Sequence, residues 1–431
     1  MLRLAFLGAD SFWLDEAFSV VHVVDRSTRE LWAASPDPNH PSLYFVILQQ
    51  ALQIGGTSET VARLPSALAS VCSLPLLFVL GIRLGVTRAT ALSAVVLLAL
   101  APLDVWYAQE ARMYAMVTTA GLLFAIALTI DSWVGAALTW AALTLALYLD
   151  FTLVPLSAGV TALWLVRWWL GGRRPLALVR VGVACAVAWW CARPIWTHLG
   201  QVVDRVDTVP MFVNARDWFG LHLAPGTPSI VTMFALTLGL GIGALLILHG
   251  LRRDRFARGL AVLAGAGFIA CTVAFAAPRA YSAKQYIVTG WPFVVLAVTW
   301  LLTDRAPGKL WRPIAVGVSL VAAVVTVATP RADWRGVVAY LNGAVRERSV
   351  QSVQIDPWWN TLPYDYYRPA MPALTGPLDE KIADVCLVAE RYGKRPPTSP
   401  GEAWLDAHSR LVRTVPFARL EVRCYAKGLP Q

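Results

Sequence analysis

Long apolar runs separated by short polar links fill the chain between Val61 and Ala328. Each run comes close to the roughly 20 residues that a helix needs to cross a bilayer. The pattern therefore predicts an α-helical polytopic membrane protein with about ten crossing helices. The expected spans are Val61–Leu84, Ala89–Trp106, Tyr114–Ile130, Trp133–Leu149, Phe151–Leu170, Leu178–Trp196, Ile230–His249, Gly259–Ala277, Gln285–Thr303 and Pro313–Thr329.

The pattern differs on both sides of these runs. Asn39–Gly55 is apolar but too short for a crossing, which is typical of an interfacial helix on the membrane surface. From Arg331 onward the chain is polar and changes period, which predicts a small α/β domain. Its expected elements are a helix at Trp334–Arg346 and strands at Val350–Ile355, Asp384–Ala389 and Leu420–Tyr425. We expect three regions, at residues 1–60, 61–330 and 331–431.

Composition and charge agree with a membrane protein and give it an orientation. The chain is 57% hydrophobic and 15% charged, whereas about 25% charged residues is usual in soluble proteins. The net charge of +10 is split into small clusters between apolar runs, which argues against a nucleic-acid partner and for the positive-inside rule. The links expected in the cytoplasm are Gly85–Arg88, Gly171–Arg180, Leu251–Arg258 and Asp304–Arg312. Both termini and the α/β domain would then be extracytoplasmic.

Two of the six cysteines fall outside the apolar runs. Cys386 and Cys424 lie on two of the predicted strands, and an extracytoplasmic location permits a disulfide that would join neighbouring strands. The sequence alone leaves the geometry of this bridge open.

The first candidate for chemistry is the segment SFWLDEAFSV, which carries the adjacent carboxylates Asp15 and Glu16. Neighbouring helical positions do not share a face, so one acid can face a cavity while the other serves the structure. The alternative is that both acids simply favour the positive end of a short helix dipole.

The second candidate is the segment DVWYAQEARMY, which places charges among aromatic rings at the outer end of one predicted span. Glu110 and Tyr114 share a helical face, and Arg112 could either pair with a carboxylate or hold a phosphate. An interfacial aromatic belt with a structural ion pair is the alternative. The candidate residues here are Asp104, Tyr107, Glu110, Arg112 and Tyr114.

Further outward-facing polar residues are scattered along the chain. Taken singly, each is expected to anchor its helix at the membrane interface. Arginines at the outer ends of helices oppose the positive-inside rule, and a buried anionic ligand would explain some of them. The sequence contains no P-loop, dinucleotide fingerprint, nucleophile elbow or helical metal-binding pattern. Pairs of acidic residues can nevertheless bind a divalent cation, so a cation remains an alternative to a metal-free site. These residues include Asp37, His40, Asp150, Arg279, Lys284 and Tyr286.

Three stretches in this order resemble the bacterial relatives of protein O-mannosyltransferases and aminoarabinose transferases, which belong to the GT-C superfamily. The stretches cover the first quarter of the chain: SFWLDEAFSV, then HPSLYFVILQ with ARLPSALAS, then YAQEARMYAM. Looser matches follow at KQYIVTGWPFVVLA and DWRGVVAYL.

The resemblance implies a multi-helix enzyme that moves a sugar from a polyprenyl-phosphate carrier to an acceptor on the extracytoplasmic side. The first outer loop of such enzymes carries the catalytic acid, which Asp15 matches with Glu16 beside it. Glu110 and Arg112 match the second outer-loop motif. Basic residues on later loops would hold the donor phosphate, and Lys284 is the best positional match.

The chain departs from the family pattern at two places. Relatives normally have a crossing helix ahead of the acidic loop, whereas only Met1–Ala9 precedes it here, so we expect a missing helix or a mis-assigned start. Relatives often show an Arg-Tyr pair before the penultimate helix, whereas this chain has Gln285 and Tyr286 after Lys284. The phosphate ligand could therefore be Arg279.

The expected partners are a polyprenyl-phosphate sugar, membrane lipid, and a glycan, lipid or protein acceptor. A transporter or flippase of lipid-linked sugars would also place charge in a membrane cavity, but no internal repeat is visible in the sequence. A non-catalytic membrane scaffold is the other alternative, and it leaves the clustered carboxylates unexplained.

Overall fold

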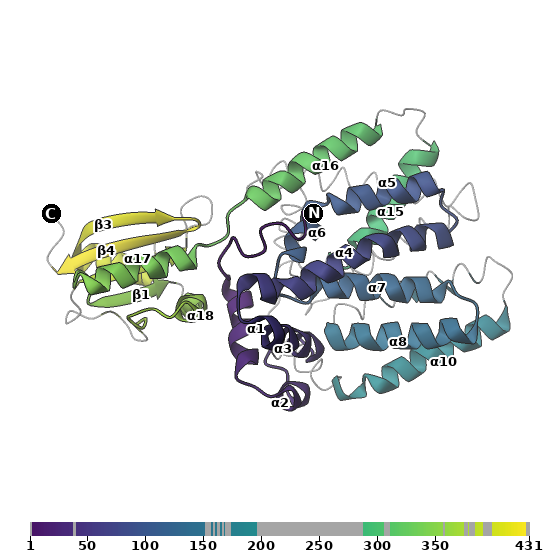
Figure 1. The fold of residues 1–431 in the computed structure, drawn as a ribbon, viewed down its shortest axis with the longest axis horizontal. Helices are drawn as coiled ribbons and strands as arrows, with labels where there is room; N and C mark the ends of the chain where they lie inside the picture. Colours follow the sequence, from purple (N-terminus) through teal and green to yellow (C-terminus); the bar gives the residue numbers. More distant parts are fainter. Residues whose placement is uncertain are drawn as a thin grey trace. The chain divides into compact units, whose positions relative to one another are not determined.

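The computed structural model divides the described residues into two compact units (Figure 1). The helical unit consists of Met1–Ala5, Ser27–Ala51 and Arg63–Ala328, and the sheet unit of Phe6–Arg26, Leu52–Ala62 and Thr329–Gln431. The structure describes residues 2–37, 40–150, 174–195, 288–305, 311–356, 358–374, 384–390 and 399–427, with single positions between 157 and 168 and at 378.

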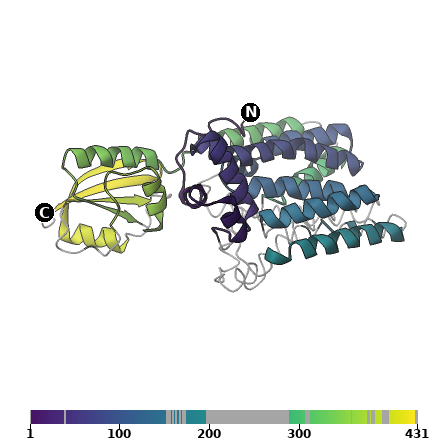
Figure 2. The ribbon, with the colours of Figure 1, turned by 60° about the horizontal axis from the view of Figure 1, so that its bottom comes forward.

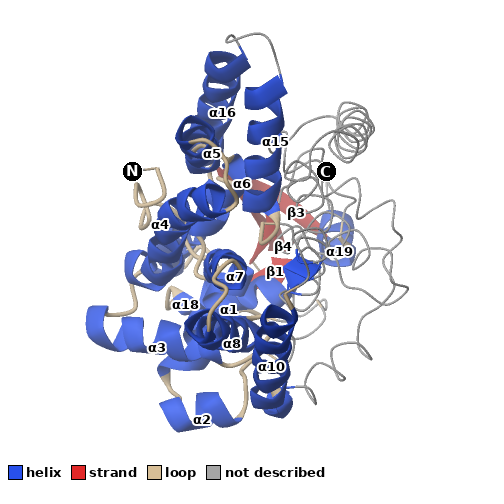
Figure 3. Ribbon diagram, turned by 90° about the vertical axis from the view of Figure 1, so that its right-hand side faces the viewer, coloured by secondary structure: helices blue, strands red, loops and turns tan. Residues whose placement is uncertain are grey.

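Apolar helices make up the helical unit. Within it α7 packs against α8, α8 against α10, and α5 against α15, and Figure 3 shows α7 and α8 nearly end on. Its helices are α2 (Thr28–Ala33), α3 (Leu43–Gly55), α4 (Glu59–Arg83), α5 (Arg88–Ala99), α6 (Pro102–Ala108), α7 (Tyr114–Leu128), α8 (Trp133–Leu149), α10 (Pro175–Cys191), α15 (Trp291–Arg305) and α16 (Trp311–Ala328). The first turns of α4 and the last turn of α3 belong to the sheet unit.

The helices agree with the apolar pattern of the sequence. The structure places α8 at the predicted bounds, and α4, α7, α10 and α16 begin and end within a few residues of theirs. By length and composition, α4 can cross a membrane, and the bent pair of α5 and α6 can provide a second span among the described residues. The other apolar helices are shorter, so the number of crossings stays a prediction. Predicted spans at Ile230–His249 and Gly259–Ala277, and nearly all of Phe151–Leu170, lie outside the described residues.

Apolar side chains also cover outward faces of these helices. On α16, Ile314, Val318 and Val321 are 62%, 64% and 64% exposed and follow one another at helical spacing. A soluble protein rarely leaves such a stripe open to water, and the stripe is typical of a surface that faces lipid.

The predicted helix Ala89–Trp106 is wrong as a single helix, because the chain bends by 58° between α5 and α6. Pro102 lacks a backbone N–H and disfavours a helical residue before it, and Ala101 is accordingly extended. The break releases carbonyl oxygens, and Arg3 takes two of them: Nη1 and Nη2 each donate at 2.7 Å, to Ala99 and Leu98. The bend is therefore stabilised by the N-terminal segment.

The sheet unit is built around a four-stranded sheet of order β1-β2-β4-β3. Strands β1 and β2 are parallel, and β4 runs antiparallel to both of its neighbours. The elements are α1 (Leu14–Val24), α17 (Trp334–Arg346), β1 (Ser352–Asp356), a 3-10 turn η2 (Trp358–Asn360), α18 (Thr361–Tyr366), β2 (Val385–Glu390), α19 (Pro400–His408), β3 (Ser409–Phe417) and β4 (Leu420–Lys427). The helix α17 has the predicted bounds, and three strands lie where the sequence predicts them.

Each face of the sheet has its own apolar core, because strand residues alternate between the faces. Val337 and Leu341 of α17 pack with Val353 and Val388 on one face. Leu387 packs with Leu405 of α19 on the other face. Figure 2 shows the strands between the green helix α17 and the yellow helix α19.

Cys386 and Cys424 form the disulfide that the sequence left open. They are direct register partners on β2 and β4, so the bridge joins neighbouring strands as expected. The strand β3 was not predicted: it lies at the sheet edge, and most of its side chains are exposed, so its sequence lacks the alternation of a half-buried strand.

Candidate functional site

The two acids of the first motif differ in their surroundings within the sheet unit. Both lie in the first turn of α1, where the helix dipole favours negative charge. Glu16 is fully buried, and its Oε2 accepts a hydrogen bond from the Trp13 backbone N–H at 3.4 Å. Asp15 is only partly buried. A carboxylate that reacts with a substrate needs access, so the geometry favours Asp15 for chemistry and Glu16 for structure.

A buried cation lies beside Glu16. Nη1 of Arg331 is 3.8 Å from Glu16 Oε2, and its Nε is 3.9 Å from Asp10 Oδ2. Arg331 is 5% exposed and Glu16 is fully buried, so their charges interact with little screening by water, whereas Asp10 is 36% exposed. The sequence signal for this pair was weak, because more than 300 residues separate its members.

The helical unit contains a second, separate group of charged residues around His40. Its Nδ1 is 2.8 Å from Asp150 Oδ2, and its Nε2 is 3.8 Å from Asp37 Oδ2. All three residues are buried. Each nitrogen of the imidazole ring therefore faces a carboxylate, which fixes the orientation of the ring.

Arg112 belongs to the same group. Its Nη2 is 3.5 Å from Asp37 Oδ2, and its guanidinium carbon is 5.9 Å from the centre of the Tyr114 ring. The Ser66 hydroxyl donates to the backbone carbonyl of Arg112 at 2.6 Å. Of the two roles open to Arg112 from the sequence, the structure shows pairing with a carboxylate.

Buried aromatic residues extend this group. Tyr114 is 1% exposed. The ring of Tyr114 contacts those of Tyr107 and His40 edge on, at centroid distances of 5.3 and 6.4 Å. We call Asp37, His40, Tyr107, Arg112, Tyr114 and Asp150 the His40 cluster. Glu110 is buried two residues before Arg112 in the sequence. Carboxylates and an imidazole can hydrogen-bond a polar ligand, and aromatic rings can pack against its apolar face.

Asp104 takes part in a different arrangement. It is buried, and its charge interacts with that of Arg3, whose Nε donates to the Ser70 hydroxyl at 2.6 Å. Arg3 also caps the broken helix, so a structural role explains Asp104 without a ligand. Its role in substrate binding stays a prediction.

The three expected residues of the later loop, Arg279, Lys284 and Tyr286, lie outside the described residues. Among the residues that are described, no group of three or more His, Cys, Asp or Glu side chains is arranged to hold a metal ion. Asp37 and Asp150 were noted in the sequence only as outward-facing polar residues, and the structure adds them as the partners of His40.

Solved structures share the fold of the chain over nearly its whole length. A crystal structure of ArnT from Cupriavidus metallidurans bound to undecaprenyl phosphate matches with a TM-score of 0.56 and 14% identity, covering 98% of this chain and 96% of that one. The apo state of the same protein matches with a TM-score of 0.57 and 15% identity, over 98% and 95% of the two chains.

This likeness confirms the expected resemblance at the level of the fold: the chain shares the fold of ArnT. No protein-family model matches the sequence, and neither does any curated protein.

Proposed function

We propose that this chain is a membrane glycosyltransferase that moves a sugar from a polyprenyl-phosphate donor to an acceptor hydroxyl on the extracytoplasmic face. The observation that carries the proposal is the end-to-end fold likeness to ArnT, which was crystallised with undecaprenyl phosphate. The accessible carboxylate of Asp15 and the buried His40 cluster support it, because sugar transfer needs a base and groups that hold a sugar.

The proposed reaction is a single displacement with Asp15 as the base. The Asp15 carboxylate takes the proton of the acceptor hydroxyl, whose oxygen forms a bond to the anomeric carbon of the donor sugar. The bond between that carbon and the phosphate oxygen breaks at the same time, and polyprenyl phosphate leaves with the electron pair. Attack from the face opposite the phosphate inverts the anomeric configuration.

The leaving phosphate needs positive charge rather than a proton, because it is already a good leaving group at neutral pH. Cationic side chains close to the phosphate oxygens would stabilise the negative charge that develops as the bond breaks. Lys284 and Arg279 are the proposed ligands from the sequence, and Arg112 is a third candidate. A divalent cation would serve the same purpose.

The His40 cluster is proposed to bind the sugar or its phosphate. Carboxylates of Asp37 and Asp150 can accept hydrogen bonds from sugar hydroxyls, and the Tyr107 and Tyr114 rings offer flat apolar faces. Since His40 is oriented by a carboxylate at each nitrogen, its ring is fixed before a ligand arrives.

A transfer assay tests this function against its rivals. Membranes that contain the full-length protein receive radiolabelled polyprenyl-phosphate sugar and a mixture of cell-envelope acceptors. We expect the label to appear in a new glycoside, with one polyprenyl phosphate released for each sugar transferred. A flippase would move the intact labelled lipid across the bilayer, and a scaffold would leave it unchanged. Either result would reject the proposal.

A further inference from the structure

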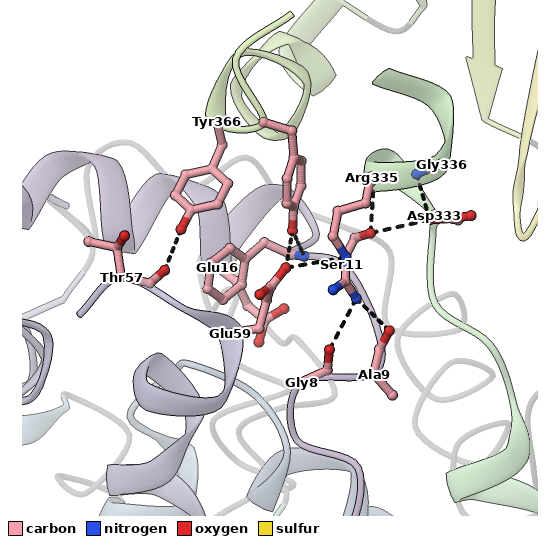
Figure 4. Close-up of polar contacts among 12 residues, drawn as sticks. Gly8, Ala9, Ser11, Glu16, Thr57, Glu59, Asp333, Arg335, Gly336 and Tyr366 are labelled. Carbon is pink, nitrogen blue, oxygen red and sulfur yellow. Dashed lines mark hydrogen bonds and ion pairs between the residues drawn. The ribbon is translucent and has the colours of Figure 1, made fainter. Parts of the chain in front are cut away.

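The backbone ahead of α1 is held by α17 within the sheet unit (Figure 4). Nη2 of Arg335 donates to the carbonyl oxygen of Gly8 at 3.1 Å and also to that of Ala9. The backbone N–H of Arg335 donates to the Ser11 hydroxyl at 3.0 Å. Residues 8–11 are therefore tied to the first turn of α17.

Tyr367 holds the next residue in the same way. Its hydroxyl accepts a hydrogen bond from the Phe12 backbone N–H at 2.8 Å and donates one to Glu59 Oε1 at 2.7 Å. The Phe12 ring is fully buried and contacts the Tyr366 ring edge on. Burial, and then the bond to Glu59, raise the pKa of Tyr367 well above its ordinary value, so the hydroxyl keeps its proton and goes on donating.

Arg331 also contacts the turn that begins α1. Its guanidinium faces Asp10 before the turn at 3.9 Å and Glu16 within it at 3.8 Å. Glu16 is fully buried, so removing the neighbouring cation would leave an unpaired buried carboxylate and destabilise the sheet unit. Asp15 shares this turn with Glu16, and its backbone cannot move unless that of Glu16 moves as well.

We propose that Arg331 is a positioning residue for sugar transfer: through Glu16 and Asp10 it fixes the first turn of α1 and with it the Asp15 carboxylate. This inference rests on the function proposed above. It makes the C-terminal part of the chain necessary for the chemical step, in addition to any contact with the acceptor. A merely structural role would change stability alone, whereas misplacing a reacting group by about 1 Å can cost about a hundredfold in rate.

The variant that tests this role is the double substitution Arg331→Met with Glu16→Gln. It removes both charges, so the sheet unit is not left with a buried unpaired carboxylate. The full-length protein in lipid nanodiscs is examined for kcat, for KM of the donor, and for amide hydrogen exchange in residues 10–19. We expect kcat to fall by about ten- to a hundredfold with unchanged KM. Amide exchange in residues 10–19 should become faster. The single variant Arg331→Lys keeps a cation beside Glu16, so it should retain more of the wild-type kcat than the double variant does.

Arg423→Met is the matched control, because Arg423 is also buried in the sheet unit and pairs with Glu402 and Asp406. It should lower the thermal stability and leave kcat and exchange in residues 10–19 unchanged. Wild-type kcat in the double variant, or wild-type exchange in that segment, would overturn the inference. A wild-type protein that transfers no sugar would instead overturn the proposed function, so the two failures are distinguishable.

Discussion

Replacing Asp15 with Asn is expected to lower kcat for sugar transfer by about 10²- to 10⁴-fold, the usual contribution of a general base. The amide has nearly the shape of the carboxylate but cannot take a proton from the acceptor hydroxyl. Asp15 is only partly buried, so the substitution should lower the thermal stability only slightly, through the lost interaction of its charge with the helix dipole. Initial rates of transfer at saturating donor, together with thermal unfolding in nanodiscs, measure both quantities. Wild-type turnover in this variant would end the assignment of Asp15 as the base.

Glu16→Gln is the matched comparison, since it makes the same chemical change one residue further along. The Glu16 carboxylate is buried beside Arg331 and bonded to the Trp13 backbone. We expect the free energy of unfolding of the sheet unit to fall by about 1–3 kcal/mol, with a smaller loss of kcat than in the Asp15 variant. If Glu16→Gln lowered kcat more than Asp15→Asn did and left the free energy of unfolding unchanged, Glu16 would be the base and Asp15 the structural residue.

Arg112→Met is expected to damage both the stability of the helical unit and the use of the donor. Its loss leaves the carboxylate of Asp37 buried beside His40 without this cation, which typically costs about 3–5 kcal/mol. If Arg112 also bonds the substrate, kcat/KM for the donor should fall by about ten- to a hundredfold, the value of a charged hydrogen bond. Thermal unfolding and donor titrations separate the two effects.

The double variant Arg112→Met with Asp37→Asn distinguishes a structural from a substrate-binding role. Removing both charges should restore most of the stability, whereas kcat/KM for the donor should stay low. Recovery of wild-type kcat/KM would show that neither Arg112 nor Asp37 binds the donor, which would contradict the role proposed for the His40 cluster. Arg180→Met is the control: Arg180 pairs with the half-exposed Asp131 at 2.9 Å, and the loss of such a pair should cost about 0–1 kcal/mol and leave transfer unchanged.

Much of the fold follows from local pattern. The helices α8 and α17 have the predicted bounds, because one lies in an unbroken apolar run and the other has a strong apolar face. The bend before Pro102 was missed, because an apolar run long enough for a crossing outweighed a single proline. Its stabilisation by Arg3 depends on contacts across more than 90 residues, which no local pattern contains.

The candidate residues were easier to find than their partners. Motifs in the sequence pointed to Asp15 and Arg112, but not to Arg331 beside Glu16 or to Asp150 beside His40, since those pairs form only when distant segments fold together. The sequence also does not show that the segment around α1 belongs with the C-terminal sheet. Apolar periodicity reports which face of an element is buried, and it does not report what lies against that face.

The anomeric configuration of the product tests the central claim most directly. The purified protein in nanodiscs is given a polyprenyl-phosphate sugar labelled with ¹³C at the anomeric carbon, and the new bond is examined by NMR. We expect a glycoside of inverted configuration, formed together with free polyprenyl phosphate and lost in the Asp15→Asn variant. Label that stays on the lipid, or a product that retains the donor configuration, would contradict single displacement by a base-activated acceptor.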